Sequence, residues 1–260
     1  MADSQIARAR RAARRTADRI RWRGRIQTVL AGPAAGLRMQ AGPASADYTS
    51  GTNEEPVQAL LASSLVPGDT FVDIGANVGF FSMLAARLVG PSGRVIAFEA
   101  VTDLADRATA NARLNGFDQL EVHAIAIGAT NGTARLSITT HSGGASLSEE
   151  VDPSEVVTVV DVPVVDVASL IEDGTIPLPD VVKIDVEGYE LPVLEGMISV
   201  FELGQTSLII ELDAPNEPEL SQKSAAVIEL LDRYGYQTNA LPSAYPDTDW
   251  EVAHLHATPR

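Results

Sequence analysis

The sequence predicts an α/β fold built around a mostly parallel sheet. The first observation is that strand-like and helix-like runs alternate along most of the chain. The second is the segment FVDIGANVGFFS at residues 71–82, in which an apolar run leads into a turn with two glycines and then into a helix-compatible apolar run. Strands that alternate with helices need crossover connections, and such connections place the strands in parallel.

The expected elements follow one another in a regular order. Residues 56–65 have helical spacing of apolar side chains, and Pro56 suits a first helical turn because its missing N–H is not needed there. Runs rich in Val, Ile and Phe predict strands, whereas apolar residues three and four positions apart predict helices. We expect strands at residues 70–74, 94–98, 121–127, 181–184 and 207–212. We expect the other helices at residues 80–88, 104–115, 191–201 and 219–234.

One segment interrupts this order. Residues 133–140 and 156–165 are both rich in β-branched residues, and the polar stretch HSGGASLSEE lies between them. We expect an inserted or edge pair of strands here, followed by a short helix at residues 167–172.

The composition is ordinary for a soluble globular protein. The chain has 260 residues, 45% of them hydrophobic and 21% charged, which suits one large domain or two small ones. No apolar run approaches the roughly 20 residues of a membrane span, so we expect no integral membrane association. The absence of cysteine excludes disulfides and thiolate metal sites and is compatible with the cytoplasm, where we expect the protein to act.

Charge is unevenly distributed. The net charge is −16, yet the first 38 residues hold ten arginines and two aspartates, so the remainder carries −24. An acidic body repels nucleic acid, which we therefore exclude as a partner. The arginine-rich arm has the charge to touch an anionic surface, but a solvated helix or an arm folded back on the acidic body is the simpler interpretation. We expect an Arg-rich, helical or loosely ordered extension at residues 1–45 and one globular domain at residues 46–260.

Acidic residues stand at the ends of several expected strands. Ligands of open α/β sheets bind beyond the carboxyl ends of the strands. The acids at these ends are Asp73, Glu99, Asp185, Glu211 and Asp213. One such acid is as easily a helix cap or a solvated charge, but acids at the same end of four strands point to a binding site.

The turn after the first strand narrows the choice of ligand. A dinucleotide fingerprint needs a second glycine where this sequence has Asn77, and Asp73 would repel a phosphate. The chain also has no P-loop motif. S-adenosylmethionine fits better, because it carries an ammonium and a sulfonium and no phosphate. Gly75 and Gly79 would allow close approach of its carboxylate, and Glu99 would accept its ribose hydroxyls.

Four blocks of sequence carry a family resemblance. FVDIGANVGFFSMLAARL, RVIAFEA, NARLNGF and VVKIDVEGYELPVLEGM occur in this order. Together they resemble the FkbM family of S-adenosylmethionine-dependent methyltransferases, from about Tyr48 to Asp213. The resemblance implies the class I methyltransferase fold (Rossmann-like), a seven-stranded mostly parallel sheet with helices on both faces and a final antiparallel hairpin. The last two strands would lie near residues 236–240 and 250–256.

The resemblance also implies cofactor contacts. Glu99 matches the ribose-binding acid, Asp185 matches the acid of KIDVEG beside the methionine end, and residues 126–128 match the segment that flanks the adenine. Residues 51–54 belong to a region that closes over the cofactor in the family, although Thr52 could equally cap a helix. The implied cofactor-binding residues are Asp73, Gly75, Ala76, Asn77, Gly79, Glu99, Ala126, Ile127, Asp185, Gly51, Thr52 and Glu54.

The sequence departs from the family pattern in two segments. Ala100 and Val101 replace a proline-containing turn after the ribose-binding acid, which leaves the shape of that loop open. Asp213 stands where many relatives have a histidine, which argues against a histidine base at this position.

Methyl transfer to a hydroxyl requires alignment of the reactants and removal of the hydroxyl proton. The catalytic candidates are Asp185, Glu187, Glu211 and Asp213. A Mg²⁺ ion held by Asp185 with Glu211 or Asp213 is an alternative that we do not favour, and we expect no metal site. We expect the acceptor pocket to include His141, Ser142 and Ser146, whereas His123, His254 and His256 look like ordinary strand residues.

The family resemblance thus implies an enzyme that methylates a hydroxyl of a small molecule such as a sugar or secondary metabolite, with S-adenosylmethionine as cofactor. N-methylation, a non-catalytic cofactor-binding module and a dinucleotide dehydrogenase are the alternatives. Homo-oligomerisation is left open.

Overall fold

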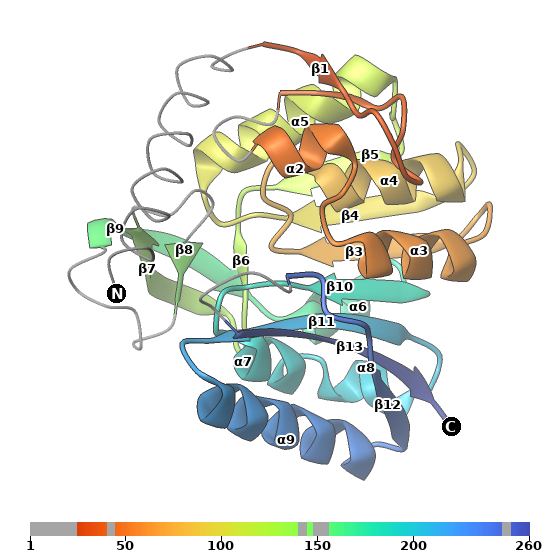
Figure 1. Ribbon diagram of the computed structural model, residues 1–260. Helices are drawn as coiled ribbons and strands as arrows, with labels where there is room; N and C mark the ends of the chain where they lie inside the picture. Colours follow the sequence, from red (N-terminus) through yellow and green to blue (C-terminus); the bar gives the residue numbers. More distant parts are fainter. Residues whose placement is uncertain (1–24, 41–44, 140–144, 148–155, 246–250) are drawn as a thin grey trace.

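A seven-stranded sheet forms the centre of the computed structural model, which describes residues 25–40, 45–139, 145–147, 156–245 and 251–260. The strand order is β12-β13-β11-β10-β3-β4-β5, and helices cover both faces (Figure 1). The strands are β3 (Thr70–Ile74), β4 (Arg94–Phe98), β5 (Leu120–His123), β10 (Val181–Ile184), β11 (Ser207–Ala214), β12 (Tyr236–Ala240) and β13 (Glu251–Pro259).

The pairing confirms the predicted class I fold. The five strands from β11 to β5 run parallel to their neighbours, and β13 lies antiparallel to both β11 and β12. The chain therefore ends in an antiparallel hairpin at one edge of the sheet, as the family resemblance implied. The strands expected at residues 70–74, 94–98 and 181–184 have the predicted bounds.

Two layers of buried apolar side chains pack the helices against the sheet. On one face lie α3 (Glu55–Ser64), α4 (Phe80–Val89) and α5 (Thr102–Asn115). On the other lie α6 (Val167–Glu172), α7 (Glu190–Glu195), α8 (Ile198–Glu202) and α9 (Glu217–Arg233). Because side chains alternate along a strand, β3 gives Phe71 to the first layer and Val72 and Ile74 to the second.

The same alternation places charged side chains in the layer under α3 and α4. Asp73 and Lys183 are register partners on β3 and β10, and Ile209 of β11 is the partner of Lys183. Ile209 belongs to the core under α3 and α4, so Glu211, two residues farther along β11, points to this face too. A row of charges therefore crosses an otherwise apolar layer.

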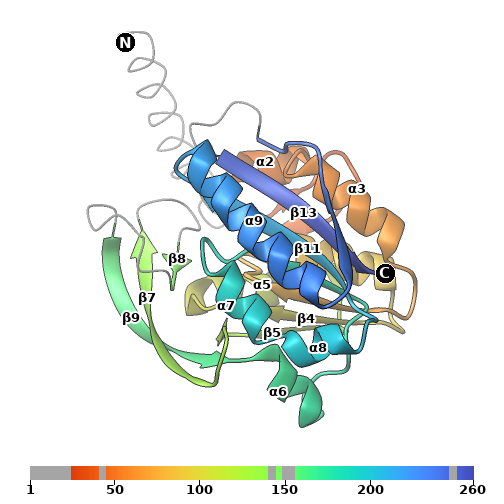
Figure 2. The ribbon, with the colours of Figure 1, turned by 90° about the horizontal axis from the view of Figure 1, so that it is seen from below.

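A second, four-stranded sheet stands beside the first, with the order β6-β9-β7-β8 (Figure 2). Its strands are β6 (Ala126–Ile127), β7 (Gly132–Thr139), β8 (Ala145–Ser146) and β9 (Val156–Val165). The long antiparallel pair β7–β9 confirms the predicted inserted strands, and a small core that includes Leu136 and Val162 supports it.

Two expected elements are each divided in the structure. The strand expected at residues 121–127 is wrong as one unit, because β5 ends at His123 and β6 pairs with β9 in the second sheet. The helix expected at residues 191–201 is interrupted at Gly196, between α7 and α8. A Cβ atom at Gly196 would lie 2.1 Å from the carbonyl oxygen of Gly128, so this close approach of two backbones requires glycine.

The described part of the N-terminal segment lies against the domain. β1 (Gln27–Thr28) and β2 (Arg38–Met39) form a hairpin, and α2 (Ser45–Ser50) follows. Leu37 and Met39 are buried in the core that α3 and α4 share. The arginine-rich arm at residues 1–24 lies outside the described residues, and the division of the chain at residue 46 stays a prediction. Within the described residues, no helix has the length and apolarity needed to cross a membrane.

The buried hydroxyl of Tyr236 gives a test of the hairpin's packing. It donates a hydrogen bond of 2.9 Å to the carbonyl oxygen of Thr206, and Tyr236 is 1% exposed. We expect Tyr236→Phe to lower the free energy of unfolding by about 1–3 kcal/mol, because a buried acceptor loses its partner. Urea denaturation measures this change. Tyr234→Phe, at the half-buried end of α9, is the control with little effect, and equal losses in both variants would contradict the assignment.

Candidate active site

A pocket opens at the carboxyl ends of β3, β4 and β10, between the main sheet and the small second sheet. Apolar side chains such as Phe98, Leu136 and Tyr189 form much of its wall. It also collects residues that the sequence singled out as a cofactor or catalytic site. Those that line it are Gly75, Asn77, Glu99, Ala126, Ile127, Asp185 and Glu187.

The glycine turn brings its backbone against the end of β10. Gly75 has a φ of +83°, and a Cβ atom there would lie 1.7 Å from the carbonyl oxygen of Asp185, so no other residue fits. Asn77 also has a positive φ, +51°, which asparagine tolerates better than most residues. Its side-chain oxygen accepts a hydrogen bond of 2.8 Å from the N–H of Val78. The turn therefore keeps its shape although it lacks the second glycine of a dinucleotide fingerprint.

Glu99 lies at the end of β4 and is held by two backbone amides. Its carboxyl oxygens accept hydrogen bonds from the N–H groups of Asn77 and Val101, both at 2.8 Å. Burial raises the pKa of Glu99 to about 7, although the two amides act in the opposite direction. The side chain is thus fixed at the pocket wall as an acceptor whose charge changes near neutral pH.

Lys183 is a buried cation beside the pocket. It is 1% exposed, and its ammonium lies 2.8 Å from Asp185 and 4.8 Å from the ring centre of Phe81. Burial alone lowers its pKa, but Asp185, Glu54 and Asp73 together raise it above the usual range. Sequence reasoning missed this residue, although a lysine within the apolar run VVKI was the signal that could have revealed it.

Asp73 lies below the turn and does not line the pocket. The residue is 1% exposed, and its carboxylate accepts a hydrogen bond of 2.5 Å from the hydroxyl of Ser82. Its other oxygen has no partner within the described residues, and burial raises its pKa. Ala76 and Gly79 also stay outside the pocket lining. Gly79 instead allows α4 to approach Ala108 of α5, where a Cβ atom would lie 3.0 Å from the methyl carbon.

Glu187 extends into the pocket from the loop after β10. Its φ is +52°, and its carbonyl oxygen accepts a hydrogen bond of 2.6 Å from the hydroxyl of Ser146 on β8. Burial and the nearby carboxylates of Asp185 and Asp213 raise the pKa of Glu187 well above its usual value. Ser146 thus connects the second sheet to the candidate catalytic loop, whereas His141 and Ser142 lie outside the described residues.

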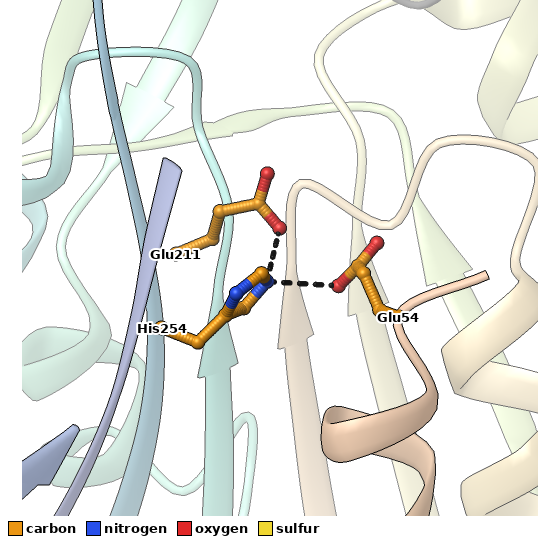
Figure 3. Close-up of side chains that lie close together, drawn as sticks. All are labelled: Glu54, Glu211 and His254. Carbon is orange, nitrogen blue, oxygen red and sulfur yellow. Dashed lines mark hydrogen bonds and ion pairs between the residues drawn. The ribbon is translucent and has the colours of Figure 1, made fainter. Parts of the chain in front are cut away.

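A second group of polar residues lies under α3, and Figure 3 shows its three central side chains. The Nε2 atom of His254 lies 2.7 Å from a carboxyl oxygen of Glu211 and 3.3 Å from one of Glu54. Glu211 and His254 are cross-strand partners on β11 and β13. None of the three lines the pocket. We call Glu54, Glu211 and His254 the Glu–Glu–His cluster.

Sequence reasoning recovered this cluster only in part. Glu211 was a catalytic candidate and Glu54 an expected cofactor contact, but His254 was taken for an ordinary strand residue. The pairing of β13 with β11 brings His254 beside Glu211, and the sequence alone does not reveal this register. Asp213 follows on β11 without lining the pocket.

The segment before α3 packs against the N-terminal part of the chain. A Cβ atom at Gly51 would lie 2.1 Å from the carbonyl oxygen of Ala31, so this glycine accommodates the N-terminal segment. Thr52 is exposed, and its hydroxyl lies 2.6 Å from that of Ser50. Gly51 and Thr52 do not line the pocket, and their contact with a cofactor stays a prediction.

Gly75 offers a test of the turn geometry. We expect Gly75→Ala to lower the free energy of unfolding by about 2–5 kcal/mol, because it combines a strained φ with a backbone clash. Gly116→Ala is the matched control: Gly116 also has a positive φ, +71°, but no atom within 4 Å of the added Cβ. The control should lose only about 1 kcal/mol. Denaturant titration compares the two, and similar losses would show that the close approach to Asp185 is absent.

Comparison with known proteins agrees with this geometry. The methyltransferase FkbM domain matches residues 73–238, more than half of the chain. Hexuronic acid methyltransferase AglP of Haloferax volcanii is 29% identical over 167 residues, which are 64% of this chain and 65% of that protein. Protein-L-isoaspartate O-methyltransferase 2 of Archaeoglobus fulgidus is 38% identical over 55 residues, 21% of this chain and 25% of that protein.

A solved structure, methyltransferase FkbM from Methylobacillus flagellatus, has a TM-score of 0.49 at 16% identity and covers 78% of this chain and 50% of that one. The chain thus spans less than two thirds of the length of these relatives. Because the family match begins in the strand before the glycine turn and extends into β12, the chain belongs to the FkbM family of methyltransferases.

Proposed function

We propose that the protein transfers the methyl group of S-adenosylmethionine to a neutral hydroxyl of a sugar-like small molecule. The observation that carries this proposal is the pocket itself. A glycine turn, an amide-held acid at the end of β4 and a second acid at the end of β10 share one partly apolar cavity.

The pocket's chemistry fits the cofactor. Glu99 presents an acceptor for ribose hydroxyls, and the apolar side chains of Phe98 and Ile127 suit a purine ring. Asp185 stands beside the Gly75 turn and suits an ammonium. The acids that line the cavity disfavour a pyrophosphate, which argues against a dinucleotide. When bound, the cofactor supplies an activated methyl group.

Glu187 is the base that we assign to the acceptor hydroxyl. It lines the pocket, and burial together with nearby carboxylates raises its pKa above the usual range, which makes it a stronger proton acceptor than an ordinary carboxylate. Asp185 is less suited, since its carboxylate already forms an ion pair of 2.8 Å with the ammonium of Lys183. Among the four candidates from the sequence, only these two line the pocket.

Two observations support the proposed acceptor class: the acidic lining of the pocket and the substrate named for one relative. Three acids, Glu99, Asp185 and Glu187, line the cavity and disfavour an anionic group at the reacting position. The hexuronic acid methyltransferase that this chain resembles acts on a sugar acid, which offers both hydroxyls and a carboxyl group. The acidic lining favours one of the hydroxyls.

Labelled S-adenosylmethionine and a panel of sugars and uronic acids test this assignment. We expect a methyl ether that withstands mild base. A base-labile methyl ester, or methylation of an amine only, would overturn the hydroxyl assignment. No transfer, together with no S-adenosylhomocysteine binding, would overturn the proposed function as a whole.

Glu187→Gln tests the role of Glu187 as a base separately from cofactor binding. We expect kcat to fall by at least about a hundredfold while the affinity for S-adenosylhomocysteine is kept, because the variant loses the proton acceptor. Glu190→Gln is the matched control, since Glu190 is also a buried acid but does not line the pocket. Steady-state kinetics and calorimetry measure the two parameters. An equal fall in both variants would contradict the role of Glu187.

Cofactor affinity is expected to depend on pH through Glu99. Ribose hydroxyls bind the ionised carboxylate better, so bound cofactor lowers the pKa of Glu99, which is about 7 in the free protein. Affinity for S-adenosylhomocysteine should therefore fall as the pH drops below 7, with a proton released on binding. Glu99→Gln should bind more weakly at neutral pH and lose this dependence.

Glu190→Gln is again the control, because burial also raises the pKa of Glu190 to about 7 outside the pocket. Calorimetry in buffers of different ionisation enthalpy measures the released proton. A pH dependence that persists in Glu99→Gln would assign it to another group.

A further inference from the structure

Three metal-ligating side chains from distant parts of the chain converge in the Glu–Glu–His cluster (Figure 3). Glu54 precedes α3, Glu211 lies on β11, and His254, 200 residues after Glu54, lies on β13. One ligand atom from each lies within 4.8 Å of the others. The side chains are strongly buried, with exposed fractions of 5%, 15% and 1% respectively.

The two carboxylates face the same nitrogen. Nε2 of His254 carries at most one hydrogen, yet carboxyl oxygens of Glu211 and Glu54 lie 2.7 and 3.3 Å from it (Figure 3). One proton cannot satisfy both at full strength. With metal–ligand bonds of about 2.1 Å, two atoms at neighbouring positions of one ion lie about 3 Å apart. The observed distances lie on either side of this value.

The second ring nitrogen of His254 sets a condition on the bound state. Nδ1 is buried and has no hydrogen-bond partner within the described residues. A neutral imidazole that binds a cation through Nε2 carries its hydrogen on Nδ1, so the ring keeps a buried N–H group but not the positive charge of an imidazolium. The cation then supplies positive charge to both carboxylates in place of the proton on Nε2.

The surroundings of Glu54 orient it as a ligand. The hydroxyl of Tyr245 and the side-chain amide of Asn53 both donate to Oε1 of Glu54, at 2.9 and 3.0 Å. The second oxygen, Oε2, is the one that faces His254. Hydrogen bonds that fix a carboxylate in this way are typical of the outer shell of metal sites.

Neighbouring charges also favour a cation. Ile210 of β11 pairs with Ile184 of β10, and Glu211 and Asp185 are the next residues on these two adjacent strands. Asp185 therefore adds negative charge beside the carboxylate of Glu211.

We propose that Glu54, Glu211 and His254 bind a divalent first-row transition-metal ion such as Mn²⁺ or Zn²⁺. The imidazole ligand favours these ions over Mg²⁺, which prefers oxygen ligands and water. This site differs from the Mg²⁺ site that the sequence suggested as an unfavoured alternative, because His254 and Glu54 replace Asp185 and Asp213. It also goes beyond the proposed methyl transfer, since its occupancy is measured without cofactor or acceptor.

The test is calorimetric titration of the full chain, stripped with chelator, with Mn²⁺, Zn²⁺ and Mg²⁺ in turn. We expect one Mn²⁺ or Zn²⁺ ion per chain and much weaker binding of Mg²⁺. Glu211→Gln and His254→Gln should each weaken binding at least tenfold. Glu190→Gln, at a buried acid outside both the cluster and the pocket lining, should bind the ions as the unaltered chain does.

Protons give a second readout. A metal must displace any proton on Nε2 of His254, so protons should be released on binding and the affinity should rise with pH. Electron paramagnetic resonance of bound Mn²⁺ should show coupling to an imidazole nitrogen in the unaltered chain, which keeps the test independent of how well the variants fold.

The proposal is overturned by the absence of Mn²⁺ and Zn²⁺ binding, by binding that both cluster variants leave intact, or by bound Mn²⁺ without nitrogen coupling. Mg²⁺ binding as tight as that of Mn²⁺ would also overturn it. Because no step of the test involves methyl transfer, failure here leaves the proposed function untouched, and failure of methyl transfer leaves the metal site untouched.

Discussion

The acids near the carboxyl ends of the strands depend on one interaction, their attraction to the buried ammonium of Lys183. It lies in the layer between the sheet and α4, 1% exposed, with the carboxylate of Asp185 at 2.8 Å and the ring of Phe81 beneath it. Asp73 is its register partner on β3. A charge in such a place is stable only when it is paired, and breaking a buried pair by removing one partner costs about 3–5 kcal/mol. Lys183 therefore stabilises several acids near the carboxyl ends of the central strands.

These acids form two groups, those that line the pocket and those that are buried beneath it. Glu99, Asp185 and Glu187 line the pocket, where a ligand can reach them. Asp73, although it ends an equivalent strand, is buried against Ser82 and Lys183. The role of Asp73 against a phosphate stays a prediction, because its carboxylate lies below the turn and not in the pocket lining. The acids that do line the pocket are Glu99, Asp185 and Glu187.

Local patterns were enough to predict most of the fold. The strands at residues 70–74, 94–98 and 181–184 are short apolar runs buried on both sides, so burial and chain direction leave little freedom in their bounds. Residues 121–127 are divided into β5 and β6 because β6 pairs with β9, more than 25 residues farther along the chain. The local pattern of apolar residues does not indicate such a distant partner. Likewise, the pocket residues follow from strand ends, whereas the Glu–Glu–His cluster requires the register of β11 with β13.

The same sheet geometry explains how two cation-binding places can lie near each other without merging. Asp185 and Glu211 follow register partners on adjacent strands, so each feels the charge of the other. The ammonium of Lys183 holds Asp185, whose carboxylate lines the pocket, while His254 holds Glu211 under α3. A positive ligand at one place therefore reduces the negative potential at the other. The pocket and the Glu–Glu–His cluster are separate in their contacts but linked through charge, with the buried ammonium of Lys183 near both.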